Sequence, residues 1–428
     1  MRYRSTRKAA PEVGPSEAIA QGLAPDGGLY VPLSFPSLSP DSFDGASETR
    51  EIAARLLAPF FDGDRLAPEL EEICREAFNF PAPLRQLGDE TEVLELFHGP
   101  TAAFKDFGAR FLAAVLARLP AKGSGPLTIL VATSGDTGGA VAAAFAGRPG
   151  FEVAVLYPKG MVSERQERQL TCWGGNVLSL RVRGDFDACQ RLVKEAFQDP
   201  DLNSARRLTS ANSINLGRLL PQMVYYAKAS LEYLRRHGRP AGFIVPSGNL
   251  GNATACYWAQ RTGLPIREIH LATNANETLT SFLSEGDWRP RPTVPTLASA
   301  MDVGNPSNME RLFDLLGGPE EARAGLRATR IDDAEIRTRI AEGLERWGTV
   351  WDPHTATAAA VRESLDTPDW VLVATAHPAK FESIVEPLVG RSIEVPPALA
   401  DLLNRAPVFT EIQPEVSALK AALLEHRV

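Results

Sequence analysis

Short strand-like runs alternate with helical segments over most of this sequence, from about residue 88 onward. The expected strands occupy residues 128–132, 151–157, 177–182, 242–246, 266–273 and 370–375, and the expected helices include 104–119, 186–198, 214–236, 253–260, 333–347 and 355–364. This alternation is the signature of a mostly parallel β-sheet that helices cover on both faces. The sequence therefore predicts an α/β fold, in which ligands bind beyond the carboxyl ends of the strands.

The N-terminal part of the chain follows a different pattern. Two amphipathic segments, 51–60 and 68–78, are separated by Asp62-Gly63-Asp64, and Pro81-Ala82-Pro83 follows them. Amphipathic segments indicate helices with one buried face, and the two prolines indicate a boundary. A length of 428 residues also exceeds one compact domain. We therefore expect a helical N-terminal lobe over residues 1–87 and a larger region over residues 88–428.

The composition narrows the classes of function. The net charge is −8 and the lysines and arginines are dispersed, which argues against a nucleic-acid partner. The four cysteines, Cys74, Cys172, Cys189 and Cys256, show no CxxC spacing, so we expect neither a metal site nor disulfide bonds. No apolar run follows the N-terminus, and no stretch of about 20 apolar residues occurs elsewhere. These patterns predict a cytoplasmic protein without a membrane partner.

Lys105 is the leading candidate for a reactive group. It follows the helix-breaking run Gly99-Pro100-Thr101 and opens a segment in which Phe107, Phe111 and Val115 recur at helical spacing. An ammonium group in an apolar first turn, at the positive end of a helix dipole, is disfavoured relative to the free amine. A free amine can form a Schiff base with an aldehyde cofactor. On this evidence alone, Lys105 could also be a surface lysine whose stem packs on the helix.

A glycine-containing loop, Ser247-Gly-Asn-Leu-Gly-Asn, lies between an expected strand and an expected helix. Small residues in this position let backbone N–H groups converge on a phosphate at the helix N-terminus. The lysine and hydroxyl of a nucleotide P-loop are missing, and no GxGxxG follows a strand, so NTP hydrolysis and dinucleotide redox chemistry lose support. Taken alone, such a motif more often marks only a sharp turn.

Two further loops place hydroxyl groups at strand ends. Thr133-Ser-Gly-Asp-Thr could hold a substrate carboxylate through Ser134 and Thr137, while Asp136 faces a phenolic oxygen or an iminium. Thr375 ends the last expected strand, where its hydroxyl could meet a ring nitrogen. Each feature alone also fits an ordinary helix cap or strand end.

These features together suggest one cofactor, because pyridoxal phosphate requires a lysine amine, a phosphate-binding loop and a partner for its ring nitrogen. The same segments resemble the threonine synthase family. The resemblance rests on the following motifs: Asp26-Gly-Gly-Leu-Tyr-Val-Pro, Phe97-His-Gly-Pro-Thr-Ala-Ala-Phe-Lys-Asp-Phe, Ala132-Thr-Ser-Gly-Asp-Thr-Gly, Ser210-Ala-Asn-Ser-Ile-Asn, Ser247-Gly-Asn-Leu-Gly-Asn and Ala374-Thr-Ala-His-Pro-Ala-Lys-Phe. They cover nearly the whole chain.

The resemblance implies a type II pyridoxal-phosphate fold like that of the tryptophan synthase β-subunit. Such a fold has two mostly parallel open sheets flanked by helices, so residues 88–428 would form two α/β subdomains with the active site between them. The implied reaction converts O-phospho-L-homoserine and water to L-threonine and inorganic phosphate, the last step of threonine biosynthesis. The implied protein is a lyase acting on a small-molecule substrate, as a monomer or small homo-oligomer.

The resemblance also assigns roles to residues of this chain. Lys105 would carry the cofactor as a Schiff base, Asp136 would lie near its phenolic side and Thr375 would face its pyridine nitrogen. The cofactor phosphate would be bound by Gly248, Asn249, Leu250, Gly251 and Asn252. Two positions depart from the common pattern. Many relatives have Phe in place of Leu250, and other branches of the fold use Asn in place of Asp136, which leaves open the charge near the ring.

The substrate phosphate needs a cation of its own. The sequence offers Arg218, Lys159 and Lys380 near the motifs. We favour Arg218, because a guanidinium group binds phosphate with two parallel hydrogen bonds. Ser134 and Thr137 are the other expected substrate contacts, and His377 is expected to be part of the scaffold.

Two other functions fit the same motifs. A serine/threonine dehydratase or a β-replacing synthase would use the same cofactor groups, and it differs in whether phosphate leaves Cγ. A catalytically silent protein that binds a phosphorylated amino acid would keep the loops without needing the amine. Lys105, the one candidate amine in its helix start, argues against the silent protein.

Overall fold

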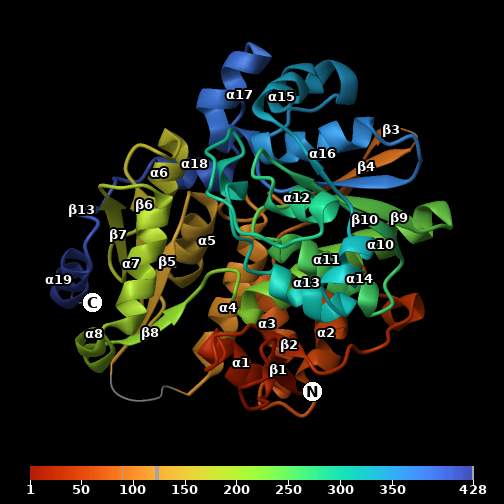
Figure 1. The fold of residues 1–428 in the computed structure, drawn as a ribbon. Coiled ribbons are helices and arrows are strands. Elements are labelled where there is room, and N and C mark those ends of the chain that lie inside the picture. Colours follow the sequence, from red (N-terminus) through yellow and green to blue (C-terminus); the bar gives the residue numbers. More distant parts are fainter. Residues whose placement is uncertain (89, 121–124, 427–428) are drawn as a thin grey trace.

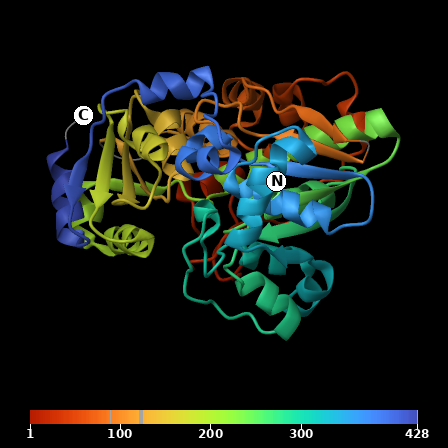
Figure 2. The same ribbon diagram turned by 90° about the horizontal axis from the view of Figure 1, so that it is seen from above.

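The structure is a computed structural model, and it describes residues 1–88, 90–120 and 125–426. The described chain forms two large sheets and one small sheet. Figure 1 shows the two large sheets side by side with helix α4 (Lys105–Arg118) between them, and the N-terminal helices packed below. Figure 2 shows the same two sheets from above, with the C-terminal helix α19 (Val416–Glu425) at the outer edge of one of them.

The larger sheet is built from both halves of the chain. Its neighbouring strands pair in parallel except at the β3–β4 edge, which is antiparallel. The strands in spatial order are β11 (Ala328–Arg330), β10 (Ile266–Thr273), β9 (Ala241–Pro246), β12 (Trp370–Ala374), β4 (Thr91–Glu95) and β3 (Leu84–Gly88). The strand β3 crosses residue 87, where the sequence suggested that the N-terminal lobe ends.

The second large sheet is entirely parallel among the described residues. Its strands in spatial order are β13 (Thr410–Ile412), β7 (Val177–Val182), β6 (Phe151–Pro158), β5 (Leu127–Ala132) and β8 (Arg207–Ser210). The chain therefore leaves the larger sheet after β4, builds β5 to β8, returns for β9 to β12 and adds β13 last. The predicted α/β fold with two mostly parallel sheets is confirmed.

Helices cover both faces of each large sheet, and the cores show this directly. In β12, Val371 and Val373 belong to the central hydrophobic cluster, whereas Leu372 lies in a second cluster on the opposite face. In β5, Val131 contributes to the central cluster and Leu130 to a third one. Alternate strand residues point to opposite faces. The central cluster is therefore shared by the inner faces of the two sheets, and the other two clusters lie outside them.

The remaining helices include those that the sequence predicted, with one exception, and several that it did not predict. Their bounds are α5 (Asp136–Phe145), α6 (Glu164–Thr171), α7 (Phe186–Gln198), α8 (Pro200–Ala205), α9 (Leu216–Leu219), α10 (Met223–His237), α11 (Gly251–Arg261), α12 (Thr278–Glu285), α13 (Met309–Leu316), α14 (Pro319–Gly325), α15 (Asp333–Trp347), α16 (Pro353–Glu363), α17 (Glu382–Val389) and α18 (Pro397–Leu403). The prediction of one helix over 214–236 was wrong. A 3₁₀ turn, η4 (Leu220–Gln222), separates α9 from α10, because Pro221 lacks the N–H that a continuous α-helix needs.

The N-terminal segment contains the two expected helices, and it also contains a third helix and a pair of strands that were not expected. The helices are α1 (Pro15–Gln21), α2 (Thr49–Leu57) and α3 (Leu70–Ala77), and β1 (Tyr3–Ser5) pairs antiparallel with β2 (Tyr30–Pro32). Tyr3 and Tyr30 are completely buried, so the strand pair contributes to the central core. Three-residue strands are too short to produce a clear periodic pattern in a sequence.

Several other features of the described residues bear on function. No helix there has the length and apolar character that crossing a membrane requires. The same residues contain no group of three or more His, Cys, Asp or Glu side chains arranged to hold a metal ion. All four cysteines are buried and free.

Candidate active site

Four polar loops converge at the carboxyl ends of strands from both large sheets. The Lys105 loop follows β4, and the segment from Thr375 to Lys380 follows β12 in the same sheet. The Ser247–Asn252 segment, which we call the glycine loop, follows β9. The Thr133–Thr137 loop follows β5 of the other sheet. The prediction that each polar loop follows a strand is confirmed, and this edge is where open α/β sheets bind ligands.

The Lys105 loop is fixed to the end of β12 by backbone contacts. Phe104 N–H donates to the carbonyl of Thr375 at 2.8 Å, and His377 N–H donates to the carbonyl of Ala102 at 3.0 Å. Ala102 adopts a positive φ of 53°, which turns the chain sharply before the helix. Lys105 is then the first residue of α4, within the first turn that the sequence predicted, and the residue as a whole is half-buried.

The surroundings of Lys105 lower the pKa of its amine to about 8. Burial is the main cause, the positive charges of Arg218 and Lys380 add to it, and the negative charge of Asp136 opposes it. The Lys105 Nζ lies 4.6 Å from the centre of the Phe104 ring. A lowered pKa of Lys105 agrees with the sequence argument, whereas the contribution of Arg218 and Lys380 to it was not foreseen.

Arg218 is a buried cation without a carboxylate partner among the described residues. Its side chain is 2% exposed, its Nη1 donates to the carbonyl of Ala211, and its Nε has no hydrogen-bond partner. Gly108, one turn after Lys105 in α4, makes room for it, since a Cβ there would lie 2.9 Å from the Arg218 Nε. Burial lowers the pKa of Arg218 to about 10, and the negative charge of Asp106 opposes that effect. The guanidinium group is therefore desolvated close to the amine.

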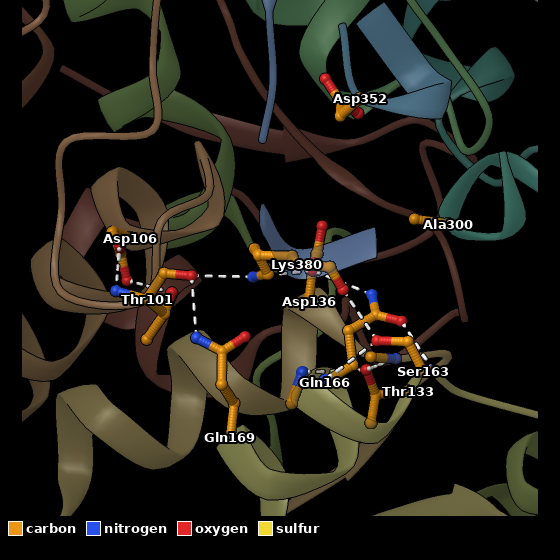
Figure 3. Close-up of polar contacts among 12 residues, drawn as sticks. Thr101, Asp106, Thr133, Asp136, Ser163, Gln166, Gln169, Ala300, Asp352 and Lys380 are labelled. Carbon is orange, nitrogen blue, oxygen red and sulfur yellow. Dashed lines mark hydrogen bonds and ion pairs between the residues drawn. The ribbon is translucent and has the colours of Figure 1, made fainter. Parts of the chain in front are cut away.

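Asp136 and Lys380 form a buried ion pair between the two sheets. The Lys380 Nζ lies 2.8 Å from Asp136 Oδ1, and their side chains are 1% and 4% exposed. The same Nζ donates to the carbonyl of Thr101 at 2.7 Å. Thr101 in turn donates to the buried carboxylate of Asp106 from its N–H and its hydroxyl (Figure 3). We call Lys105, Asp106, Asp136, Arg218 and Lys380 the charged cluster.

The glycine loop is shaped by close backbone contacts. A Cβ on Gly248 would lie 2.5 Å from the Cα of Met301, so only glycine fits there. Leu250 has a positive φ of 59° and a side chain that is 1% exposed, and α11 begins at the next residue, Gly251. The Leu250 side chain therefore anchors the loop in the core directly before α11 begins.

Neutral side chains hold the two asparagines of the glycine loop. Asn252 Oδ1 accepts hydrogen bonds from the hydroxyls of Tyr225 at 2.5 Å and Tyr226 at 2.7 Å, whereas its buried Nδ2 has no partner. Asn249 donates to the hydroxyl of Ser213 at 2.7 Å and accepts from the N–H of Ser307 at 2.6 Å. Hydrogen bonds thus hold both asparagines in place, and one amide donor is left unsatisfied.

Thr375, Ser134 and Thr137 complete the set of predicted residues near this edge. The Thr375 hydroxyl is buried without a hydrogen-bond partner, while the Thr375 N–H donates to the hydroxyl of Thr355 at 3.2 Å. Ser134 and Thr137 are half-buried on either side of Asp136. A buried hydroxyl without a partner is uncommon and indicates a ligand atom or a water molecule.

Two other residues singled out in the sequence lie in different settings. Lys159 is half-exposed and forms a surface ion pair with Glu411 at 3.0 Å. His377 accepts a hydrogen bond at Nδ1 from the N–H of Ala379 at 3.2 Å and packs edge-on against Phe97. Burial lowers the pKa of His377 to about 4, so the ring is neutral near pH 7. Both settings are those of structural residues.

Comparison with known families identifies the chain. Residues 81–375 match the family model described as pyridoxal-phosphate dependent enzyme. Residues 2–78 match the threonine synthase N terminus, and residues 355–423 match the threonine synthase C-terminal region. The chain belongs to the threonine synthase family. It is a pyridoxal-phosphate-dependent enzyme of the type II fold, as the sequence motifs predicted.

Individual relatives agree over the full length. The threonine synthase of Escherichia coli strain K12 is 40% identical over 97% of each chain, and that of Serratia marcescens is 42% identical over 91% of each chain. The crystal structure of a pyridoxal-phosphate-bound threonine synthase from Brucella melitensis covers 98% of both chains with a TM-score of 0.91 and 37% identity. The likeness therefore includes the fold, both terminal regions and the site-bearing loops.

The structure adds site residues that the sequence argument missed. Thr101 and Gln166 contact the charged cluster, and Gln166 Nε2 donates to Asp136 Oδ1 at 3.2 Å. Gln169 donates to the carbonyl of Thr101. The run from Ser163 to Gln166 matches the capping-box pattern, a helix start that the sequence shows. That signal locates the helix, but it does not say which loop the helix contacts.

Proposed function

We propose that this chain converts O-phospho-L-homoserine and water to L-threonine and inorganic phosphate. Family membership supports the proposal, and one observation in the site carries it. The buried guanidinium group of Arg218 lies near Lys105 without a carboxylate partner in the described part of the chain. A buried charge without a directly bound counterion is costly. The negative charge of Asp106 offsets it only in part, and a substrate that carries a phosphate would supply a directly bound anion.

We propose that Lys105 binds the aldehyde of pyridoxal phosphate as a Schiff base. The support is its position at the start of α4 and the lowered pKa of about 8, which leaves a useful fraction of free amine near neutral pH. Lys380 is a poor alternative, because its ammonium group is held by Asp136 and by the carbonyl of Thr101. Lys159 lies on the surface.

We assign the other cofactor contacts from polar groups that lack a hydrogen-bond partner, from the start of helix α11 and from the Asp136–Lys380 ion pair. The cofactor phosphate would lie against the glycine loop (Gly248, Asn249, Leu250, Gly251 and Asn252), where helix α11 begins and the Asn252 Nδ2 lacks a partner. The unpartnered hydroxyl of Thr375 would meet the pyridine nitrogen. Asp136 would lie near the phenolic oxygen, with its charge balanced by Lys380.

The residues of the site would then have separate roles in the reaction. Bound here, pyridoxal phosphate stabilises negative charge on the substrate carbons next to the amine. Phosphate must leave Cγ while a hydroxyl is installed on Cβ, so one proton carrier must serve several carbons. Lys105, once released from the Schiff base, is the amine placed to do so. Arg218 would hold the phosphate, and Ser134 and Thr137 would bind the substrate carboxylate.

The test is a product analysis with O-phospho-L-homoserine in water enriched in oxygen-18. We expect inorganic phosphate and threonine in equal amounts, with the heavy isotope in the threonine hydroxyl. The Lys105→Ala protein, purified in parallel, controls for contaminating activity. A keto acid with ammonia would instead identify a dehydratase, and the absence of any turnover by the cofactor-loaded protein would identify a silent binding protein.

We further propose an organisation for the whole protein. Residues 1–87 would form the N-terminal lobe, and residues 88–428 would form two α/β subdomains, one around each large sheet. The adjoining family matches at residues 78 and 81 support this division. Four free, buried cysteines support a reducing cytoplasm. We also propose that the protein acts in threonine biosynthesis as a monomer or small homo-oligomer. Light scattering of the purified protein would measure its assembly state.

A further inference from the structure

Lys380 is the buried centre of contacts between three separate parts of the chain. It lies in η6 (Pro378–Phe381), a 3₁₀ turn that follows β12 of the larger sheet. Its Nζ reaches Asp136 at the start of α5, which belongs to the other sheet, and the carbonyl of Thr101 in the Lys105 loop. The side chain is 1% exposed, so these contacts are made away from water. One ammonium group therefore joins both sheets to the loop that carries the reactive amine.

Helix α6 holds all three parts of this arrangement. Ser163, which caps the helix, donates from its hydroxyl to the carbonyl of Lys380 at 2.7 Å. One turn later Gln166 donates to the Asp136 carboxylate at 3.2 Å, and after another turn Gln169 donates to the carbonyl of Thr101 at 3.0 Å. Side chains three residues apart lie on one face of a helix. A single helix face thus orients the carboxylate, the Thr101 carbonyl and the turn that carries the lysine (Figure 3).

The charges around Lys105 explain why such an arrangement is useful. Asp136 on α5 favours its ammonium form, whereas Arg218 on α9 and Lys380 on η6 oppose that form. Within α4, the Asp106 carboxylate is held by Thr101. A buried carboxylate beside an amine ordinarily pairs with it and keeps it protonated. A protonated amine is not a nucleophile.

We propose that Lys380 is a positioning residue that neutralises Asp136 and holds it against the Lys105 loop, so that Asp136 does not become the counterion of Lys105. Asp136 then pairs with Lys380 and not with Lys105, so the Lys105 amine remains available for Schiff-base formation. The inference rests on the proposed role of Lys105. It adds a reason for a lysine in η6 that neither cofactor binding nor substrate binding requires.

The charge balance can be tested in the protein without cofactor. The measurement is the pH dependence of Lys105 acylation by a trace of acetic anhydride, read by peptide mass spectrometry. We expect a wild-type midpoint near pH 8. The Lys380→Met protein should show a midpoint about one to two units higher, because the unpaired Asp136 then stabilises the Lys105 ammonium. The Asp136→Asn protein should show a lower midpoint, because Lys380 then repels that ammonium.

The double variant, Lys380→Met with Asp136→Asn, removes both charges and should return the midpoint to within about half a unit of wild type, because the opposing contributions cancel. A purely structural lysine would not give shifts of opposite sign that cancel. The matched control is Lys159→Met, which removes a surface lysine from its Glu411 pair and should leave the midpoint unchanged.

Specific results would overturn the proposal. An unchanged or lowered midpoint in Lys380→Met, or shifts of the same sign in both single variants, would contradict it. If Lys380→Met does not fold, the comparison of Asp136→Asn with the double variant decides the same question, since the second substitution must raise the midpoint again. Failure of the Lys105 assignment is detected separately, by mapping the lysine that carries the cofactor.

Discussion

The glycine loop and the charged cluster belong to the same candidate site, but one consists of neutral residues and the other of ionisable residues. The glycine loop has no ionisable side chain, and its asparagines are held by tyrosine and serine hydroxyls and by backbone groups. The charged cluster contains five ionisable residues, most of them buried. Backbone N–H groups at a helix start can bind a phosphate without a buried positive charge. The loop therefore adds no charge that would disturb the protonation of Lys105.

Because of this difference, cofactor affinity and the chemistry at Lys105 can be changed separately by substitution. Changes in the glycine loop should alter how tightly the cofactor is held, with little effect on the charge of the amine. Changes in the charged cluster should alter chemistry or substrate use while the cofactor still binds. Four sets of substitutions test this separation, beginning with the largest expected effect and ending with the smallest.

The largest effect is expected from Lys105→Ala. Turnover should fall by roughly 10³-fold or more, because the variant loses both the covalent attachment and a proton carrier. The glycine loop should still bind pyridoxal phosphate without a covalent bond, which absorbance after gel filtration detects. Lys159→Ala is the control and should keep full turnover. A Lys105→Ala enzyme within about tenfold of wild type would contradict the assignment.

A pair of glycine substitutions tests the loop. Gly251→Ala should weaken cofactor binding about tenfold or more through obstruction of the phosphate approach, a loss of about 1.4 kcal/mol. The nearest protein atoms would lie 3.4 Å from the new Cβ, so the cofactor-free protein should keep its melting temperature. Gly248→Ala should weaken binding as well, but it should also lower that melting temperature, because its Cβ would meet Met301 at 2.5 Å. Unchanged cofactor affinity in both proteins would place the phosphate elsewhere.

Arg218→Ala should impair the use of O-phospho-L-homoserine selectively. The lost charge-assisted contact corresponds to about 1.5–3 kcal/mol, or roughly a 10- to 150-fold fall in kcat/KM. Binding of an amino acid without a phosphate should change much less, as spectroscopic titration of the cofactor shows. Arg218→Lys keeps the charge without the paired geometry and should fall between the two proteins. Equal losses with both ligands would make Arg218 a structural residue.

Thr375→Val should have the smallest effect. Its hydroxyl has no protein partner, so the cofactor-free protein should keep its stability, while the affinity for pyridoxal phosphate falls by about 0.5–1.5 kcal/mol, roughly 2- to 12-fold. The matched control is Thr355→Val, whose hydroxyl is bonded to Asp352 and should be needed for stability. A destabilised Thr375→Val protein with normal cofactor affinity would remove Thr375 from the cofactor site.

The sequence could predict features that depend on neighbouring residues. The start of α4 at Lys105 follows from a glycine–proline break and apolar residues at helical spacing, and the glycine loop follows from its place between strand and helix. The division of the helix over 214–236 was visible in Pro221, whose effect was underestimated. The partners of the buried charged side chains could not be predicted from neighbouring residues. Lys380 was considered for the substrate phosphate, yet it pairs with Asp136 from a distant segment.

Such pairings follow from how the two sheets approach each other, and a single sequence does not encode that approach in any local pattern. The same reason hid the role of α6, whose capping box is obvious but whose contacts depend on where β12 ends. The unsatisfied groups of Arg218 and Thr375 also appear only in three dimensions, because they are defined by the absence of neighbours in the described structure.

The central claim is that one amine, set apart by its surroundings, holds the cofactor. The most direct measurement is borohydride reduction of the cofactor-loaded protein followed by peptide mapping. The account predicts a yellow protein whose pyridoxyl group is recovered on Lys105, at the start of α4. Recovery of the label on Lys380 or Lys159 would contradict it, because Lys380 would then have left its buried ion pair with Asp136 and Lys159 its surface pair with Glu411.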